Sequence, residues 1–234
     1  MIIEALHAWV LHKRWIGDTS AQATFFTFEQ GIITCLYRGG RTPKKQSLLQ
    51  EFTPLWVAVN QRGDRYYIRQ IEIVAATIQF TGHNLFAALY MNELLYYFLC
   101  PNDEYPELYK AYESVLKTLT AVNSRFGVET VLRRFEWQLL VSCGYQMSLT
   151  HDVDGRPILA DRQYQLLDGH GFMAVGKGIL GQHILAFSQD RFTDVATLKA
   201  VKWIMRRAID FALDGRAIKA RELYKNNLRN VSIE

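Results

Sequence analysis

The chain has 234 residues, of which 49% are hydrophobic and 21% charged, with a formal net charge of +4. This length allows one or two domains with a buried core, and no apolar run approaches the roughly 18 residues that would span a bilayer. Residues 1–4 lack the basic start of a signal peptide, and the three distant cysteines argue against a disulfide framework and a paired-cysteine metal site. These features favour a cytoplasmic protein with no membrane partner.

The charges are unevenly distributed along the chain. Residues 1–80 hold 9 Lys and Arg against 6 Asp and Glu, residues 81–185 hold 8 against 11, and residues 186–234 hold 10 against 6. The two ends are therefore basic and the middle is acidic. A nucleic-acid surface built from both ends would produce this pattern, and chance would also produce differences of this size.

Residues 1–80 have the turn signals of a β domain. A strand is expected at 7–12, a hairpin joins 24–28 to 32–37, and a second hairpin joins 56–59 to 66–74. Strict alternation in the last strand places Ile68 on one face and Arg69 and Ile71 on the other. About five short strands in 80 residues fit a small OB-type barrel, and an SH3-like barrel fits almost as well.

A basic loop lies between the two hairpins. Gly39, Gly40 and Pro43 interrupt regular structure there, and no acid follows Arg38 until Glu51. Mobile cations in such a loop can follow phosphates without demanding a base sequence. The loop therefore suits a polyanion, and a solvated surface loop is the alternative.

The pattern changes to helices from residue 81 onward. The segment 85–99 is apolar nearly all round, which predicts a buried central helix. Asn92 and Glu93 within it must be hydrogen-bonded, and we interpret them as joining helices. Further helices are expected at 107–122, after Pro106 at its first position, and at 128–143.

The last third of the chain begins at Gly144, which ends the third helix. Residues 144–185 are irregular and predict a loop-rich insertion, and a helix capped by Asp194 should run to residue 213. A short helix is expected at 219–224. On the helix after Asp194 the expected inward face is Val195, Leu198, Val201, Met205, Ala208 and Ala212.

A basic stripe borders that inward face. Lys199, Lys202 and Arg206 fall together, with Trp203 and Arg207 next around the helix. Cations beside a tryptophan could bind a nucleic-acid strand. A solvated helix face is the alternative.

The order of short motifs resembles the RecO family of bacterial recombination-repair proteins, essentially from end to end. No single motif is diagnostic, but the set is specific in this order and at this length. The motifs are Ala8-Trp-Val-Leu-His-Lys-Arg14 with Asp18-Thr-Ser20, the hairpin at Gly31, Gly39-Gly-Arg41, Leu49-Gln-Glu-Phe-Thr-Pro-Leu55, Tyr90-Met-Asn-Glu-Leu-Leu95, Leu132-Arg-Arg-Phe-Glu136, Gly144-Tyr145 and Lys219-Ala-Arg-Glu-Leu223.

The resemblance implies an α+β fold, with an N-terminal OB-fold barrel at 1–80 and a helical domain at 81–234 whose C-terminal helices (186–234) pack back on the helical core. It implies a non-enzymatic mediator that binds single- and double-stranded DNA and anneals complementary strands. The mediator would also bind the acidic tail of single-stranded-DNA-binding protein, and together with RecR (and RecF) it would promote the loading of RecA. Many members carry paired zinc-binding cysteines after the Gly-Tyr motif. Residues 144–185 contain none, so a zinc-free insertion is expected.

Candidate functional residues follow from these observations, with no catalytic residue, cofactor or metal among them. Trp15 or Tyr37 could stack on bases. Arg133 or Arg134 is our choice for the partner's acidic tail, because arginine pairs with carboxylates in bidentate fashion, and an ion pair with Glu129 or Glu136 is the alternative. The expected DNA-binding cations are Lys13, Arg14, Arg38, Arg41, Lys44, Lys45, Lys199, Lys202 and Arg206.

Two other functions remain open from the residues alone. A metal-dependent nucleic-acid hydrolase would use His151 and Asp154, but spacing identifies no further ligand or general base, and a polar turn is favoured. An RNA-binding OB module would be distinguished by contacts to the ribose 2′-hydroxyl.

Overall fold

The computed structural model describes the backbone of residues 2–223 and the side chains of residues 6–223. The chain divides into two compact units. The first is formed by two segments, one that ends at Ala121 and one that begins at Ile218, and the second is formed by Val122–Ala217. Within the described residues, no helix is both long and apolar enough to cross a membrane.

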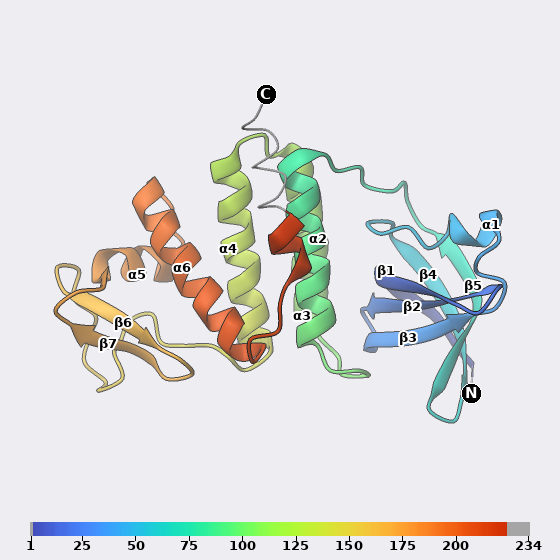
Figure 1. Cartoon of the computed structure of the whole chain (residues 1–234), viewed down its shortest axis with the longest axis horizontal. Helices are drawn as coiled ribbons and strands as arrows, with labels where there is room; N and C mark the ends of the chain where they lie inside the picture. The colour runs from blue at the N-terminus through green and yellow to red at the C-terminus, as the bar shows by residue number, and fades with distance from the viewer. Residues whose placement is uncertain (1, 224–234) are drawn as a thin grey trace. The chain divides into compact units, whose positions relative to one another are not determined.

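The N-terminal part is a closed five-stranded barrel (Figure 1). Its strands neighbour one another in the order β1-β2-β3-β5-β4, with β4 also pairing with β1. All pairs are antiparallel except β3 with β5. This order is that of an OB-type barrel, and the predicted α+β fold is confirmed. The strands are β1 (Ile2–Ile16), β2 (Ser20–Thr27), β3 (Gly31–Tyr37), β4 (Leu55–Arg62) and β5 (Arg65–Ile73).

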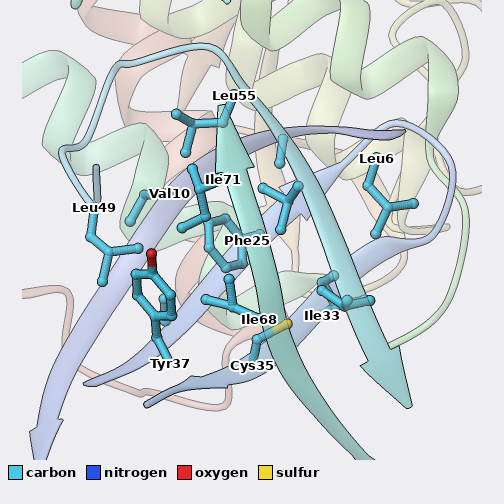
Figure 2. Packing of buried hydrophobic residues seen from close by; sticks show 14 of the residues in the cluster. Leu6, Val10, Phe25, Ile33, Cys35, Tyr37, Leu49, Leu55, Ile68 and Ile71 are labelled. Atoms are coloured by element: carbon cyan, nitrogen blue, oxygen red, sulfur yellow. The ribbon is translucent and has the colours of Figure 1, made fainter. Parts of the chain in front are cut away.

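Alternate residues of these strands fill the barrel interior (Figure 2). Phe25, Ile33 and Leu55 are at most 1% exposed, and each such side chain contributes about 1.5–3 kcal/mol by leaving water. Burial raises the pKa of Cys35 to about 12, so its thiol stays protonated at neutral pH. The described interior is thus an apolar core in which the Cys35 thiol is protonated.

The last barrel strand departs from strict alternation. Ala58 lies opposite Gln70, but the next residue, Val59, lies opposite Ile68, so Arg69 is an extra residue in β5. This β-bulge shifts the alternation of inward- and outward-facing side chains along β5, so both Ile68 and Ile71 point into the core. The prediction that Ile68 and Ile71 face opposite sides was therefore wrong.

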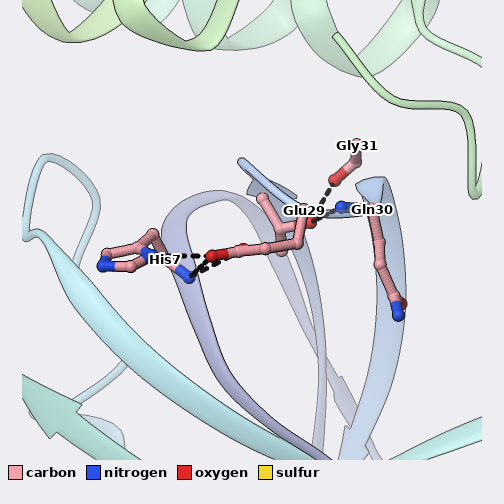
Figure 3. Close-up of polar contacts among 5 residues, drawn as sticks. His7, Glu29, Gln30 and Gly31 are labelled. Carbon is pink, nitrogen blue, oxygen red and sulfur yellow. Dashed lines mark hydrogen bonds and ion pairs between the residues drawn. The ribbon is translucent and has the colours of Figure 1, made fainter. Parts of the chain in front are cut away.

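The turn between β2 and β3 is held by polar contacts (Figure 3). Glu29 accepts hydrogen bonds from the backbone N–H of His7, at 3.0 Å, and contacts its ring Nδ1 at 2.6 Å. Gly31 has a φ of 58°, and a Cβ there would lie 1.7 Å from the carbonyl oxygen of Asp103. Only glycine fits this close approach, which accounts for the residue at the predicted hairpin.

Two helices of the first unit, α2 (Gly82–Phe98) and α3 (Pro106–Ala121), follow the barrel. The Asn92 side chain accepts a hydrogen bond from the Tyr112 hydroxyl and donates one to the Val10 carbonyl, which ties both helices to β1. The Glu93 carboxylate accepts from the backbone N–H groups of Lys219 and Ala220. The structural interpretation of Asn92 and Glu93 is therefore confirmed. Residues 219–223 are helical, and Tyr224 lies outside the described residues.

The second unit combines α4 (Arg125–Ser142), α5 (Gly181–Ser188) and α6 (Val195–Ala212). The Asp194 carboxylate accepts from Thr197 N–H at the start of α6, as predicted. On the face of α6 predicted to point inward, Val195 is instead 56% exposed. The expected loop-rich insertion contains a three-stranded sheet that the sequence did not predict, made of β6 (Gln163–Leu167), β7 (Gly171–Val175) and β8 (Ile179–Leu180) in the order β7-β6-β8.

Candidate nucleic-acid interface

The basic segment after β3 is a folded turn followed by the short helix α1 (Pro43–Gln46). The backbone N–H of Arg41 donates to Thr19 O, and Lys45 Nζ donates to the carbonyl of Arg38 at 2.8 Å. Pro43 starts α1 because its fixed φ suits the first helical position. The expected irregular loop therefore needs correction, since Pro43 begins a helix where it was predicted only to interrupt one.

Gly39 and Gly40 have separate physical roles in this turn. Gly39 has a φ of 67°, a left-handed conformation that favours glycine. A Cβ on Gly40 would lie 2.9 Å from both the Ala21 Cβ and the Tyr37 carbonyl oxygen. The pair therefore lets the segment turn sharply and lie against β2, which brings the cations after it to one end of the barrel.

Each cation of this segment except Lys44 lies over an aromatic ring. The Arg41 guanidinium carbon is 5.8 Å from the Trp15 ring centre, and Lys45 Nζ is 4.8 Å from that of Tyr37. The Arg38 guanidinium is 5.4 Å from the ring centre of Tyr67, on β5. Such cation–π contacts stabilise by about 0.5–1 kcal/mol at exposed sites. We call this set the basic end, and define it as Arg38, Arg41, Lys44 and Lys45 with Trp15, Tyr37 and Tyr67.

The two rings proposed for base stacking differ in exposure. Trp15 is 41% exposed and can receive a base on its free surface. Tyr37 is only 6% exposed, and burial raises the pKa of its hydroxyl. The prediction of Tyr37 as an exposed stacking residue is therefore wrong, because its ring packs in the barrel core.

The two cations of β1 also differ. Lys13 Nζ donates to the Leu49 carbonyl at 2.6 Å and lies 3.5 Å from Glu51 Oε2. It therefore anchors the segment that follows α1. Arg14 is exposed and donates from Nε to the side-chain oxygen of Gln22 on β2. Of the two, Arg14 has the more accessible charge.

The basic stripe of α6 is interleaved with acids. Lys202 Nζ lies 2.9 Å from Glu129 Oε1 of α4. Partial burial raises the pKa of Glu129, but hydrogen bonds from Lys202 and Arg125 outweigh that effect, so its pKa is lowered. Lys199 is exposed, and Arg206 lines a hollow that also includes Asp168 and Asp210. The stripe thus has carboxylates close to Lys202 and Arg206.

The two arginines predicted for a partner's acidic tail have different surroundings. Arg133 is 4% exposed, and its Nη2 donates to the buried Glu136 carboxylate at 2.8 Å. Its Nε and Nη1 have no hydrogen-bond partner in the described part of the chain. Arg134 is exposed, donates to Asp190 at 2.7 Å and lies 5.7 Å from the Phe192 ring centre.

Aromatic rings accompany Arg134 in the second unit. Phe187 contacts both Trp137 and Phe192 edge-on, with ring centres 5.5 and 5.8 Å apart. Trp137 and Phe192 are partly exposed. An aromatic side chain could pack against these rings while its neighbouring carboxylate reaches arginine.

The His151–Asp154 segment forms a self-contained turn. The Asp152 carboxylate accepts from the backbone N–H groups of Asp154 and Arg156, and Asp154 pairs with Arg156 at 3.2 Å. His151 N–H donates to Ser148. Among the described residues, no three His, Cys, Asp or Glu side chains are grouped to hold a metal. These contacts match the polar-turn interpretation.

The sequence interpretation missed Arg62, which lies next to the basic end. Arg62, at the end of β4, places its guanidinium 6.0 Å from the Tyr67 ring centre. The available signal was the Arg62-Gly63-Asp64-Arg65 turn, whose two arginines flank a tight hairpin.

A closed OB-type barrel with a basic, aromatic end, continued by helices, defines an α+β protein of the OB class. The family described as "Recombination protein O N terminal" matches residues 1–77, and "Recombination protein O C terminal" matches residues 79–222. The chain belongs to the RecO family, and its role is in DNA repair and recombination.

Curated relatives match nearly the whole chain. A "DNA repair protein RecO" from Legionella pneumophila (strain Corby) is 50% identical over 226 residues, which are 96% of this chain and 99% of the relative. Proteins of the same description from Actinobacillus pleuropneumoniae serotype 7 (strain AP76) and Pseudoalteromonas atlantica (strain T6c / ATCC BAA-1087) are each 34% identical. The first alignment covers 98% of both chains, and the second covers 96% of this chain and 95% of the relative.

Proposed function

We propose that this protein is a non-enzymatic mediator of recombinational repair that binds single- and double-stranded DNA and anneals complementary strands. The observation that carries the proposal is that the cations of the basic end have no counter-ion among the described residues. Arg38, Arg41, Lys44 and Lys45 form no ion pair with any residue that the structure describes. Their charges are therefore available to phosphates.

Annealing requires no covalent chemistry. Two strands must approach with their backbone charge screened while their bases stay free to pair. Cations that contact phosphates meet the first requirement without reading sequence. Trp15 adds a surface on which an unpaired base can stack, worth about 1–3 kcal/mol per base. The proposal needs neither nucleotide hydrolysis nor a metal ion.

We also propose that the second unit binds the acidic tail of single-stranded-DNA-binding protein through Arg133 or Arg134. Arg134 is the more accessible of the two, because its side chain is exposed, whereas Nε and Nη1 of Arg133 are buried. The rings beside Arg134 could receive the tail's terminal aromatic residue. Binding this tail would bring the protein to DNA that is already coated. We propose that RecR (and RecF) are the partners with which the protein then promotes RecA loading.

The DNA site is tested by reversing charges at the basic end. Arg41→Glu/Lys44→Glu/Lys45→Glu removes three phosphate contacts, so the slope of log K against log salt for single-stranded DNA should fall by about 2, at roughly 0.7 per contact. The matched control, Lys110→Glu/Lys117→Glu/Arg156→Glu, reverses three exposed charges elsewhere. Fluorescence anisotropy of a labelled oligonucleotide gives both slopes.

Equal slopes for the wild type and the basic-end variant would move the DNA site away from this surface, and Lys199, Lys202 and Arg206 of α6 would be the next candidates. The same titration with an RNA oligonucleotide of identical sequence distinguishes a DNA-binding protein from an RNA-binding module, because the latter would bind the RNA more tightly than the DNA. Turnover of either strand on adding a divalent metal would reverse the non-enzymatic assignment.

A further inference from the structure

We propose that the β4–β5 hairpin is part of the same DNA surface, and that Tyr67 positions Arg38 and Arg62 for phosphate contacts. The inference rests on the proposed function, and it adds residues of a different hairpin to the site. Tyr67 is thereby a positioning residue that acts through the two arginines.

Strand register explains why these three side chains meet. Tyr67 lies on β5 between two neighbouring strands, opposite Leu36 of β3 and opposite Asn60 of β4. Side chains two residues apart on a strand share a face, so Arg62 stands on the same side as Asn60. Arg38 is the first residue after β3, and its contact with the Tyr67 ring places it on the side of Leu36. Both arginines are therefore diagonal neighbours of Tyr67, a distance that long side chains bridge.

The observed contacts agree with this register. The Arg38 and Arg62 guanidinium carbons lie 5.4 and 6.0 Å from the Tyr67 ring centre. Tyr67 is partly buried, whereas both arginines are exposed. Neither arginine forms an ion pair with a described residue. One ring therefore contacts two cations that pair with no carboxylate among the described side chains.

A guanidinium over a ring keeps its N–H donors available at its edge, and those donors match the oxygens of a phosphate. An arginine that is already ordered loses less side-chain entropy when it binds. Lysine at position 38 or 62 would lack the planar fork. The pair is thus suited to successive phosphates of a nucleic-acid backbone.

The location agrees with the general behaviour of the fold. OB barrels bind oligonucleotides with strands 2 and 3 and with the loops after strands 1 and 4. The loop after β4 is the turn at Gly63 and Asp64, with Arg62 and Arg65 exposed on either side. Arg41, in turn, donates to the Gly17 carbonyl in the turn after β1. The basic end therefore reaches both loops.

The test compares single-stranded DNA binding by anisotropy, as a function of salt, for Tyr67→Leu, Tyr67→Phe and Arg62→Gln. Tyr67→Leu should weaken binding at least two- to fivefold, because it removes two exposed cation–π contacts, each of which corresponds to about two- to fivefold. Its salt slope should change little, because both charges remain. Tyr67→Phe keeps the ring and should bind as the wild type does. Arg62→Gln should lower the slope by about 0.7, and the charge-matched control Arg156→Gln should not.

A double-mutant comparison separates positioning from a structural role. Adding Tyr67→Leu to Arg38→Gln/Arg62→Gln should cause no further loss if Tyr67 acts through the arginines. A further loss of two- to fivefold would overturn the positioning role, as would wild-type affinity for Tyr67→Leu. Thermal melts of Tyr67→Leu and Tyr67→Phe identify any loss that comes from unfolding.

The two proposals fail in distinguishable ways. If Arg41→Glu/Lys44→Glu/Lys45→Glu loses binding while Arg62→Gln and Tyr67→Leu do not, the basic end binds DNA and the hairpin does not contribute. If the charge reversal leaves DNA binding intact, the basic end is not the DNA site. Any effect of Tyr67→Leu on binding would then have a cause other than the positioning of phosphate-binding arginines.

Discussion

The buried ion pair on α4 gives the sharpest stability prediction. Arg133 and Glu136 are 4% and 0% exposed, with 2.8 Å between Nη2 and Oε1. Glu136→Gln keeps the side-chain shape but leaves the Arg133 charge buried without its counter-ion. Removing one partner of such a pair costs about 3–5 kcal/mol, which is a large part of the 5–15 kcal/mol typical of a folded protein.

Replacing both partners should have a much smaller effect. Arg133→Met/Glu136→Leu removes both buried charges and fills their volume with apolar atoms, a change that is often neutral or stabilising by about 1–4 kcal/mol. Urea unfolding followed by circular dichroism and by tryptophan fluorescence, with Trp137 on the same helix, measures both variants. A loss below about 1 kcal/mol for Glu136→Gln would refute the reasoning, since it would mean that Arg133 finds water or another partner.

The stable double variant also tests the partner site. It should fold normally but bind an acidic peptide ending in phenylalanine more weakly, if Arg133 supplies the carboxylate contact. Unchanged peptide affinity would leave Arg133 a purely structural residue and would direct attention to Arg134.

Two further perturbations have outcomes fixed by local geometry. Gly31→Ala should destabilise the protein by about 2–4 kcal/mol, because it adds left-handed backbone strain and a clash with the Asp103 carbonyl. Gly63 has the same φ but open space around it, so Gly63→Ala should cost only about 1–2 kcal/mol. Thermal melts of the two variants measure the difference. Glu129 has a lowered pKa when folded, so the stability from its pairing with Lys202 is present above its unfolded pKa of about 4.3 and is lost as pH falls through the folded pKa. Glu129→Gln should therefore lower the free energy of unfolding by about 1 kcal/mol at pH 7, and its stability should approach that of the wild type near pH 3. If the melting temperatures of the two proteins differ by the same amount at every pH, the pairing with Lys202 does not contribute to stability.

Local signals predicted much of the fold. Gly31 marked a hairpin because the turn requires a positive φ, and Asp194 marked the start of α6 because its carboxylate caps free N–H groups. Asn92 was expected to be hydrogen-bonded because an amide cannot be buried unpaired in an apolar helix. Such features depend on neighbours in sequence or on one strong physical constraint.

Features that depend on distant pairing could not be predicted in this way. The bulge at Arg69 is set by the register between β4 and β5, and the sheet from β6 to β8 is built of strands of only two to five residues. The composition of the basic end was visible in the sequence, but its extension to Arg62 follows only from β5 lying between β3 and β4.

The same limit applies to which cations are accessible. Sequence alone grouped Lys13 with Arg14 and Lys202 with Lys199. The structure shows Lys13 bound to the Leu49 carbonyl and Lys202 paired with Glu129. Accessibility depends on acceptors that lie 36 residues away in the first case and on another helix in the second.

The most direct measurement is strand annealing. Two complementary oligonucleotides coated with single-stranded-DNA-binding protein are mixed with the protein, without nucleotide or added metal, and duplex formation is followed by fluorescence. We expect the wild type and Lys110→Glu/Lys117→Glu/Arg156→Glu to anneal the strands, and Arg41→Glu/Lys44→Glu/Lys45→Glu to lose most of that activity. A folded wild type that fails to anneal would contradict the mediator function, and undiminished annealing by the basic-end variant would contradict the assignment of DNA to this surface.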